Sequence, residues 1–428
     1  MPTRRQFLLY SVGTMLLTCT PVFAQSTNKQ IPISAQGIAD VFGDGLKFTG
    51  IVLEYSQPVN AEQINIRQFN VQDRKILSYF VSNQPNGTAQ AQGKFVVLTL
   101  DPNEDNASLV QKKPPLTANK PQKTGNKGPG NAGDKQADGP ELKTFKAKVT
   151  VDGQTLFVNS AEKRIVDDFK QGEFNDPATN KTLRYNLFVP KNYDPQQAYP
   201  LVLFMHDAGV TGDNPLSTLI QGTGAVCWAS PQDQLEHPSF VLAPQFDEII
   251  ADDSSHTSAM LDTTIHLIQS LCQQYNIDTH RLYTTGQSGG GMMSIAMDIK
   301  YPDFFAASYL VACQWDASLV APMHKQKLWI TVSEYDSKAF PGQTAIVNEL
   351  EKNGAKVARA TWNAQWSAQQ YQQAFDELMA QKADVNFVVF EKGSVFTNQT
   401  ESQNAGGGHT FTWRYAYNIP QIRQWIFA

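Results

Sequence analysis

The chain has 428 residues, more than one ordinary domain contains, so we expect at least two folded domains. Hydrophobic residues make up 41% of the sequence and charged residues 18%, which is typical of a soluble globular protein. The formal net charge is -5 and no basic block is dense enough to bind a phosphate backbone, which excludes nucleic acid as an expected partner.

Residues 1–24 have the features of a signal peptide rather than of a folded segment. Arg4 and Arg5 precede an apolar run, as in a twin-arginine signal, and Ala24 ends a small-residue cleavage site. The apolar run is too short for a comfortable transmembrane span. We therefore expect an exported protein, periplasmic or secreted, with no stable membrane insertion after cleavage. The alternatives are an uncleaved anchor and lipid attachment at Cys19, although the residues before Cys19 match a lipobox poorly.

Residues 31–160 are predicted to form an all-β domain. Short segments rich in β-branched and aromatic residues alternate with turn signals, and Asp152-Gly153 is a hairpin turn between two of them. This pattern predicts a small sandwich of the immunoglobulin-like type. The expected strands are residues 48–55, 64–71, 95–100, 146–151 and 155–158.

Within this block, residues 103–142 form a low-complexity tract rich in Pro, Gly, Asn, Lys and Gln. The tract has almost no large apolar side chain, so it cannot bury enough surface to offset the entropy lost on ordering. We expect a disordered insertion that interrupts two strands as a long exposed loop. An inert insertion is the simpler interpretation, and a binding tail is the alternative.

Residues 165–428 alternate predicted strands and helices. The runs 201–205 and 240–243 are apolar throughout, as expected for strands that are buried on both faces. A helix is expected over residues 264–275, where apolar residues recur at a spacing of three and four. The alternation predicts an α/β domain with a doubly wound, mostly parallel sheet. Further strands are expected at residues 183–190, 281–285, 307–311, 328–332 and 385–390.

A G-x-S-x-G pattern, centred on Ser288, lies between the strand at 281–285 and a helix that starts at Gly291. A serine on a sharp strand-to-helix turn is the nucleophile elbow of an α/β-hydrolase. Side chains at Gly286 and Gly290 would collide with the neighbouring strand and helix. The positive helix N-terminus would lie under Ser288, where an oxyanion forms. The alternative is a purely structural Gly-Ser turn.

A serine nucleophile needs a base, and the base needs an orienting acid. In α/β-hydrolases the acid and then the histidine follow the serine along the chain. Asp336, just past a predicted strand, is the candidate acid, and Glu334 and Asp316 are its competitors. His409 is the candidate base, because the glycine-rich run at 406–408 lets a loop place its imidazole over the elbow.

The segment His206-Asp207-Ala208-Gly209 follows the apolar strand at 201–205. This location supplies one amide of the oxyanion hole in the α/β-hydrolase fold, and the residue after the nucleophile supplies the other. We expect the amides of Asp207 or Ala208 and of Gly289 to form the hole, with His206 as a positioning residue rather than a base. The alternative is a plain turn at the end of a strand.

Removal of the signal peptide would leave three cysteines, Cys227, Cys272 and Cys313. Three is odd, so at least one is free or bonded to another chain, and one disulfide of undetermined pairing remains open. No Cys-x-x-Cys or His-Glu-x-x-His pattern is present, so no zinc site is expected and no cofactor is implied.

With these residues placed, the second block resembles the α/β-hydrolase esterases of the polyhydroxybutyrate-depolymerase and feruloyl-esterase type. It is similar in particular to bacterial esterases that carry an N-terminal immunoglobulin-like domain, so the resemblance covers nearly the whole mature chain. It implies a triad of Ser288, Asp336 and His409. The matching segments are 206–209, 227–231, 241–245, 276–283 and 286–290, together with Asp336 and His409.

The chain departs from this group in two places. Asp207 stands where the group usually has glycine, and although aspartate tolerates unusual backbone angles, the change bears on the geometry of the oxyanion hole. Residues 362–382 look like an extra helical insertion between the acid and the histidine. Its aromatic residues fit either core packing, the commoner case, or a lid over the pocket; they are Trp362, Trp366, Tyr371 and Phe375.

The leading hypothesis is an exported serine carboxylesterase that acts on a small-molecule or polymer ester. The alternative within enzymes is a serine peptidase of the prolyl-oligopeptidase-like type, although the first block is too small for the propeller that usually accompanies that class. A third hypothesis is a binding protein with an inactive hydrolase fold. The acyl chain length, the alcohol moiety and the oligomeric state are not readable from the sequence.

Overall fold

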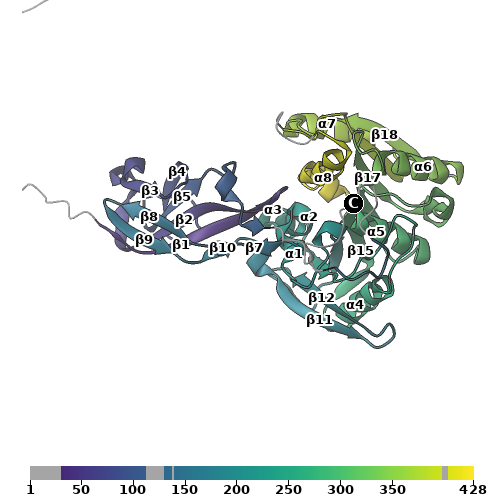
Figure 1. The fold of residues 1–428 in the computed structure, drawn as a ribbon, viewed down its shortest axis with the longest axis horizontal. Coiled ribbons are helices and arrows are strands. Elements are labelled where there is room, and N and C mark those ends of the chain that lie inside the picture. The colour runs from purple at the N-terminus through teal and green to yellow at the C-terminus, as the bar shows by residue number, and fades with distance from the viewer. Residues whose placement is uncertain (1–29, 112–129, 137–138, 398–402) are drawn as a thin grey trace, which may run out of the picture.

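The computed structural model describes residues 30–111, 130–136, 139–397 and 403–428. The predicted signal peptide lies outside the described residues, as does the middle of the predicted low-complexity tract, residues 112–129. Figure 1 shows two domains side by side along the long axis of the molecule: an all-β domain formed by the N-terminal part of the chain and an α/β domain formed by the rest. Both predicted fold classes are confirmed.

The N-terminal domain is a sandwich of a five-stranded sheet, in the order β10-β1-β2-β5-β4, and a three-stranded sheet, in the order β3-β8-β9. Apolar side chains from both sheets form one core between them. The predicted hairpin turn at Asp152-Gly153 joins β8 to β9. The strands are β1 (Pro32–Phe42), β2 (Gly45–Asn60), β3 (Phe69–Val71), β4 (Ile76–Ser82), β5 (Gln92–Leu100), β6 (Val110–Gln111), β7 (Glu141–Leu142), β8 (Ala147–Val151), β9 (Gln154–Val158) and β10 (Ala161–Lys163).

The strand predicted over residues 64–71 is wrong in its first half, where Ile66–Gln68 forms a 3-10 turn. The side chain of Asn65 accepts a hydrogen bond from the amide of Arg67 at 3.0 Å, and the side chain of Gln68 accepts one from the amide of Asn65 at 2.8 Å. These local bonds compete with β pairing, so the pairing of β3 with β8 begins only at Phe69.

The disorder predicted for the tract over residues 103–142 is wrong at both of its described ends. Strand β6 pairs with β7. On the α/β domain, the amide of Gly133 donates to the carbonyl of Ile249 at 2.8 Å, and Lys135 pairs with Asp247 at 2.5 Å. Backbone hydrogen bonds and one lysine ion pair therefore order segments that bury few apolar side chains. Amino-acid composition predicts how much apolar surface a segment can bury, but it does not predict such polar contacts.

The C-terminal domain contains a nine-stranded sheet in the order β11-β12-β14-β13-β15-β16-β17-β19-β18. Strands β11, β12 and β14 pair antiparallel, and every pairing from β14 to β18 is parallel, so the predicted mostly parallel sheet is confirmed. The strands are β11 (Lys170–Asp176), β12 (Lys181–Phe188), β13 (Tyr199–Met205), β14 (Phe240–Gln245), β15 (Ile277–Gln287), β16 (Ala307–Val311), β17 (Leu328–Ser333), β18 (Val357–Trp362) and β19 (Val385–Phe390).

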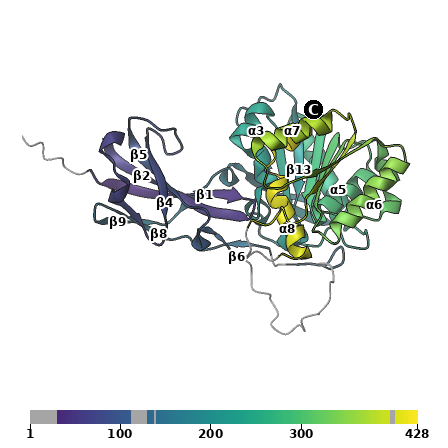
Figure 2. The same ribbon diagram turned by 90° about the horizontal axis from the view of Figure 1, so that it is seen from above.

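Helices cover both faces of this sheet, and a separate apolar core lies under each face (Figure 2). One face carries α4 (Met260–Gln274), α5 (Gly289–Lys300) and α6 (Ala339–Lys352). The other face carries α1 (Ser217–Ile220), α2 (Thr223–Val226), α3 (Pro231–Glu236), α7 (Ala368–Met379), α8 (Ala405–Ala416) and α9 (Pro420–Trp425). In the part of the chain that the structure describes, no helix is long and apolar enough to cross a membrane.

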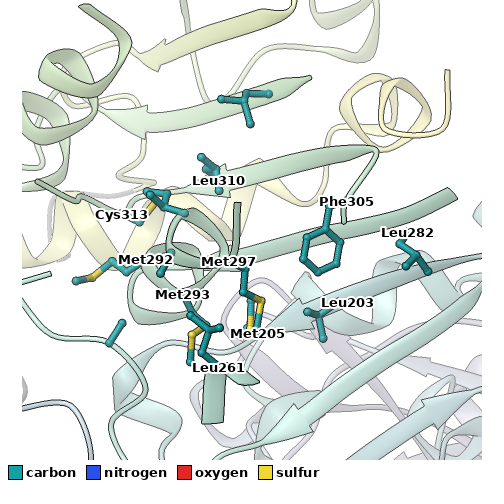
Figure 3. Close-up of a cluster of buried hydrophobic side chains, with 14 of the residues drawn as sticks. Leu203, Met205, Leu261, Leu282, Met292, Met293, Met297, Phe305, Leu310 and Cys313 are labelled. Atoms are coloured by element: carbon teal, nitrogen blue, oxygen red, sulfur yellow. The ribbon is translucent and has the colours of Figure 1, made fainter. Parts of the chain in front are cut away.

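Helix α5 is buried along most of its length, which holds its first turn firmly against the sheet. Met293 and Met297 are fully buried and lie in the same core as Leu203 and Met205 of β13 (Figure 3). Because close-packed side chains resist displacement, the start of α5 is a rigid place for a functional group.

The aromatic side chains of the segment 362–382 belong to the core, not to a lid. Trp362 is 1% exposed, and its ring centroid lies 5.8 Å from that of Trp329 on β17. Phe375 of α7 stacks on Trp329 at 5.8 Å with an interplanar angle of 18°. Trp362 is the last residue of the edge strand β18, which spans residues 357–362. Because these aromatic rings pack on Trp329 in the core, the core-packing interpretation is correct and the lid interpretation is wrong.

The three cysteines within the described residues, Cys227, Cys272 and Cys313, are free thiols, so the disulfide that the sequence left open among them is not formed. Cys227 and Cys313 are buried, and burial raises the pKa of both thiols. A buried thiol that stays protonated is a poor nucleophile, so these cysteines act as small apolar residues.

The two domains meet where the hairpin between β1 and β2 reaches α8. A side-chain carbon at Gly43 would lie 2.7 Å from both the Cα and the carbonyl oxygen of Arg414. Such a distance is too short for any Cβ contact, so only glycine lets the hairpin approach the helix backbone this closely. The hairpin tip therefore packs directly on the helix that carries His409.

Replacing Gly43 with valine should lower the free energy of unfolding by about 1–3 kcal/mol, because the new side chain must push the hairpin away from α8. Urea denaturation measures this change. Asp44→Ala is the matched control, since Asp44 lies in the same turn and its exposed carboxylate forms an ion pair with Lys47. Equal denaturation midpoints for the two variants would show that the hairpin is not packed on α8.

Asp298 of α5 is fully buried and accepts a hydrogen bond from the hydroxyl of Ser308 at 3.0 Å. Burial raises the pKa of this carboxyl from 3.8 to about 8. Between these two values the folded state binds more protons than the unfolded state, so the contribution of Asp298 to stability falls as the pH rises through that window.

Asp298→Asn should therefore flatten the dependence of stability on pH, because asparagine resembles the protonated acid and does not ionise. Relative to the wild type, the variant should gain free energy of unfolding as the pH rises from about 4 to about 8, and the gain should level off above that. Urea denaturation at several pH values measures the difference. Parallel profiles for the two proteins would contradict this assignment.

Candidate active site

Ser288 lies on the sharp turn between β15, which ends at Gln287, and α5, which begins at Gly289. Its backbone angles are φ 50° and ψ -119°, a conformation that an L-residue rarely adopts. The amide of Ser288 donates to the carbonyl of Val311 at 3.0 Å, which ties the turn to β16. A strained serine held by the neighbouring strand matches the elbow that the sequence predicts.

The two outer glycines of the elbow are required by close contacts, as the sequence predicts. A Cβ at Gly286 would lie 2.4 Å from the carbonyl carbon of Gly290, at the start of α5. A Cβ at Gly290 would lie 2.0 Å from the carbonyl oxygen of Met205, at the end of β13. Any side chain at either position would push the helix off the sheet.

The structure brings Ser288, His409 and Asp336 together in one chain of hydrogen bonds. Nε2 of His409 lies 2.9 Å from Oγ of Ser288, and Nδ1 lies 2.5 Å from Oδ2 of Asp336. The other carboxylate oxygen, Oδ1, accepts from the amides of Lys338 at 3.0 Å and Ala339 at 2.9 Å. A carboxylate only accepts, so the imidazole proton lies on Nδ1 and Nε2 presents its lone pair to the serine hydroxyl.

The competing acids lie elsewhere. Glu334 accepts a hydrogen bond from the amide of Lys392 at 3.2 Å. Asp316 is exposed and caps a 3-10 turn by accepting from the amide of Ser318 at 2.9 Å. Asp336 is 2% exposed, and its carboxylate is the one bonded to the imidazole.

His409 lies within a helix rather than on the predicted loop. Helix α8 starts at Ala405, where the side chain of Asn404 accepts from the amide of Gly407 at 2.8 Å. A Cβ at Gly408 would lie 2.8 Å from the carbonyl carbon of Tyr335, next to the acid. The glycine run therefore lets the first turn of α8 approach the acid loop closely, which sequence alone does not distinguish from loop flexibility.

His206 is buried, and its two ring nitrogens are both occupied. Nε2 accepts from the amide of Phe246 at 3.0 Å, so the proton lies on Nδ1, which donates to the carbonyl of Asp207 at 2.8 Å. Burial lowers the pKa of His206, so the imidazole stays neutral. The ring thus holds the backbone of the 207–210 segment and has no free nitrogen for proton transfer.

The amides of Ala208 and Gly289 lie on neighbouring segments of the turn region. A Cβ at Gly289 would lie 3.5 Å from the amide nitrogen of Ala208. Each is the first residue of its helix or 3-10 turn, where amides have no acceptor within the helix. Asp207 has φ -74° and ψ 167°, an ordinary extended conformation, so its departure from glycine needs no unusual backbone angle.

Three contacts of this site are absent from the sequence-based prediction. The side-chain amide of Gln287 donates to Oδ2 of Asp207 at 2.9 Å and to Oε1 of Gln221 at 3.0 Å. The indole of Trp413, one helical turn after His409, meets the imidazole edge-on at 5.2 Å. The spacing of Trp413 from His409 could have indicated their contact, whereas nothing in the sequence pairs Gln287 with Asp207. Across the described residues no group of three or more His, Cys, Asp or Glu side chains could hold a metal ion.

Comparisons with known proteins match both domains. Residues 34–164 match the model of the esterase Ig-like N-terminal domain, and residues 255–392 match the model of the prolyl oligopeptidase family. No curated protein matches the chain. A solved structure described as a thermostable esterase is similar at a TM-score of 0.72 and 24% identity, over 92% of this chain and 99% of that one.

Two further structures are similar at a lower level. One is described as a ferulic acid esterase, with a TM-score of 0.39 and 11% identity over 60% of this chain and 97% of that one. The other is FphF, a fluorophosphonate-binding serine hydrolase of Staphylococcus aureus, with a TM-score of 0.39 and 9% identity over 61% of this chain and 98% of that one.

The likeness to the thermostable esterase extends over both domains and shows that the chain has the same overall fold. The chain therefore has an α/β-hydrolase fold, and its N-terminal domain matches the immunoglobulin-like N-terminal domain of esterases.

Proposed function

We propose that this chain is an exported serine carboxylesterase in which Ser288 is the nucleophile, His409 the general base and Asp336 the orienting acid. The observation that carries the proposal is the unbroken set of hydrogen bonds from Asp336 through His409 to Oγ of Ser288, at 2.5 Å and 2.9 Å. A hydroxyl is a weak nucleophile on its own, and this arrangement supplies the base that it needs.

In the proposed reaction, Oγ of Ser288 attacks the ester carbonyl while Nε2 of His409 takes its proton. The tetrahedral oxyanion accepts hydrogen bonds from the amides of Ala208 and Gly289, which lie at the start of η5 (Ala208–Val210) and of α5. His409 then gives the proton to the departing alkoxide, leaving an acyl-enzyme. Water, activated by His409, releases the acid and restores Ser288. Asp336 stabilises the imidazolium that forms twice in each cycle.

The choice of an ester over a peptide bond is supported by the N-terminal domain. Residues 34–164 match a domain model that is described by its occurrence in esterases. The competing candidate, a prolyl-oligopeptidase-like peptidase, is favoured by the family match over residues 255–392. That match includes Ser288 and Asp336, which serve esterases and peptidases alike, and it leaves the nature of the substrate open.

Export is proposed from the sequence of residues 1–24, where Arg4 and Arg5 precede an apolar run and Ala24 ends a cleavage site. Fractionation of producing cells, with the mature N-terminus determined by mass spectrometry, tests it. A mature chain that begins at Gln25 outside the cytoplasm supports export. An intact N-terminus on cytoplasmic protein refutes it.

Hydrolysis of p-nitrophenyl esters from acetate to palmitate by the purified chain, compared with cleavage of proline-containing peptides, tests the proposed substrate class. Ester turnover that exceeds peptide cleavage in kcat/KM supports the carboxylesterase, and the chain-length profile bounds the acyl pocket. Faster cleavage of the peptides would support the peptidase instead. Turnover of neither substrate would contradict both.

A further inference from the structure

The side chain of Asp207 forms a direct link between the two segments that carry the proposed oxyanion amides. Its Oδ2 accepts from Nε2 of Gln287 at 2.9 Å. Asp207 immediately precedes Ala208, and Gln287 lies two residues before Gly289. One hydrogen bond therefore joins the loop after β13 to the elbow after β15.

The register of the sheet explains why this bond can form. Strands β13 and β15 are parallel neighbours, and Met205 lies opposite Gly286 in their ladder. Both chains leave the sheet at the same level, so side chains one or two residues further on meet across the gap. Gln287 is 1% exposed, and its amide is also held by Oε1 of Gln221 at 3.0 Å. Burial and the bond to Gln221 therefore hold the side chain of Gln287 in place independently of Asp207.

The remaining polar groups of Asp207 also hold the loop. Oδ1 accepts from the amide of Gly209 at 2.9 Å, and the backbone carbonyl accepts from Nδ1 of His206 at 2.8 Å and from the amide of Val210 at 3.1 Å. The backbone around the Ala208 amide is therefore fixed on the loop side by three hydrogen bonds. The bond to Gln287 adds a side-chain link from this loop to the elbow.

We propose that Asp207 and Gln287 are positioning residues that set the separation of the Ala208 and Gly289 amides through their mutual hydrogen bond. The inference rests on the proposed function, since it concerns the oxyanion hole of that same reaction. Neither side chain touches the reacting atoms. Hydrogen-bond donors stabilise an oxyanion best if they are held in place before the charge develops. Loss of the bond between Asp207 and Gln287 should therefore weaken the binding of the transition state more than the binding of the substrate.

The charge of Asp207 and its hydrogen bond to Gln287 make opposite predictions for Asp207→Ala, which removes both. A carboxylate close to a developing oxyanion repels it, so removing the charge alone should not slow the reaction. In Asp207→Asn the new side chain can keep its Oδ1 on the Gly209 amide and point its NH2 at Gln287. The side-chain amide of Gln287 then turns over, so that its oxygen accepts from this NH2 group. Its own Nε2 no longer donates to Gln221, but Nε2 of Gln221, which has no partner within the described residues, can donate to the Gln287 oxygen instead. If geometry is what matters, Asp207→Asn should restore most of the activity that alanine removes.

The experiment compares Asp207→Ala, Gln287→Ala, the double variant and Asp207→Asn in the full chain. We expect each alanine variant to lower kcat/KM for p-nitrophenyl butyrate by roughly 10- to 100-fold, less than the loss of an oxyanion donor itself. The double variant should be no worse than either single variant, because both remove the same bond. Asp316→Ala is the matched control: Asp316 also caps a 3-10 turn, but its carboxylate bonds only to Ser318.

A second readout separates positioning from a general loss of structure. A trifluoromethyl ketone forms a tetrahedral adduct whose oxyanion occupies the hole, so its inhibition constant should rise by the same factor by which kcat/KM falls. The inference is overturned if Asp207→Ala changes neither value, if the losses of the single variants multiply in the double variant, or if Asp207→Asn is as slow as Asp207→Ala. Turnover by the wild type in the same assay shows that such a failure concerns the positioning role alone. No turnover by the wild type would overturn the proposed function together with this inference.

Discussion

Replacing Ser288 with alanine should lower kcat for ester hydrolysis by about 10⁶-fold, because the variant has no atom that can form the acyl-enzyme. His409 and the amides of Ala208 and Gly289 stay in place, so a small residual rate above that of water should remain. Alanine removes one oxygen from the elbow and keeps its Cβ, so the fold should persist. Steady-state kinetics on p-nitrophenyl acetate measure the loss, and circular dichroism confirms the fold.

The control for this variant is Ser318→Ala, since Ser318 is exposed and its hydroxyl bonds only to Asp316. Its kcat should equal that of the wild type within error. A folded Ser288→Ala protein that keeps more than about one hundredth of the wild-type kcat would show that another group attacks the ester, since loss of a serine nucleophile costs far more.

Asp336→Asn should lower kcat by about 10⁴-fold while leaving the fold intact. Oδ1 of Asp336 is held by the amides of Lys338 and Ala339, so the asparagine must keep its oxygen there and place its NH2 where Oδ2 lies. That NH2 can only donate to Nδ1 of His409. The imidazole proton then moves to Nε2, which faces Oγ of Ser288 and can no longer accept its proton.

Glu334→Gln is the control, because Glu334 lies two residues away and bonds to the amide of Lys392 instead of the imidazole. It should leave kcat unchanged. The same kinetic assay serves both variants, and their unfolding midpoints show whether either is damaged. A large loss in Glu334→Gln with a small loss in Asp336→Asn would reverse the assignment of the acid.

The elbow could be predicted from the sequence because its constraints are local. Gly286 and Gly290 are required by contacts within a few residues and with the adjacent strand, so the pattern and its flanking elements suffice. Asp336 and His409 could be predicted from their order along the chain, because a parallel sheet places its strand ends at one edge. The contact between them still had to be seen in the structure.

Other features depend on tertiary contacts that no local pattern encodes. Glycines before His409 suggested a loop, yet they form the first turn of α8, where Gly408 packs on the backbone of Tyr335. The ends of the low-complexity tract bury little apolar surface, yet Gly133 and Lys135 attach one of them to the α/β domain through a backbone hydrogen bond and an ion pair. Composition predicts burial, but it does not predict such polar anchoring.

The bond between Asp207 and Gln287 shows the same limit. From the sequence, an aspartate in place of glycine raised a question about backbone angles, whereas the structure shows an ordinary φ of -74° and a side chain with two hydrogen-bonding roles. The identity of a residue indicates which bonds it can make. Only the register of β13 and β15 determines which partner it meets.

If Ser288 is an activated nucleophile, it should react with a fluorophosphonate, and peptide mapping of the purified, treated chain by mass spectrometry tests this directly. We expect one covalent adduct on Ser288, formed rapidly by the wild type and much more slowly by Asp336→Asn, in parallel with the loss of esterase activity. A folded wild-type chain that forms no adduct, or an adduct on a different residue, would contradict this expectation and favour an inactive hydrolase fold or a different nucleophile.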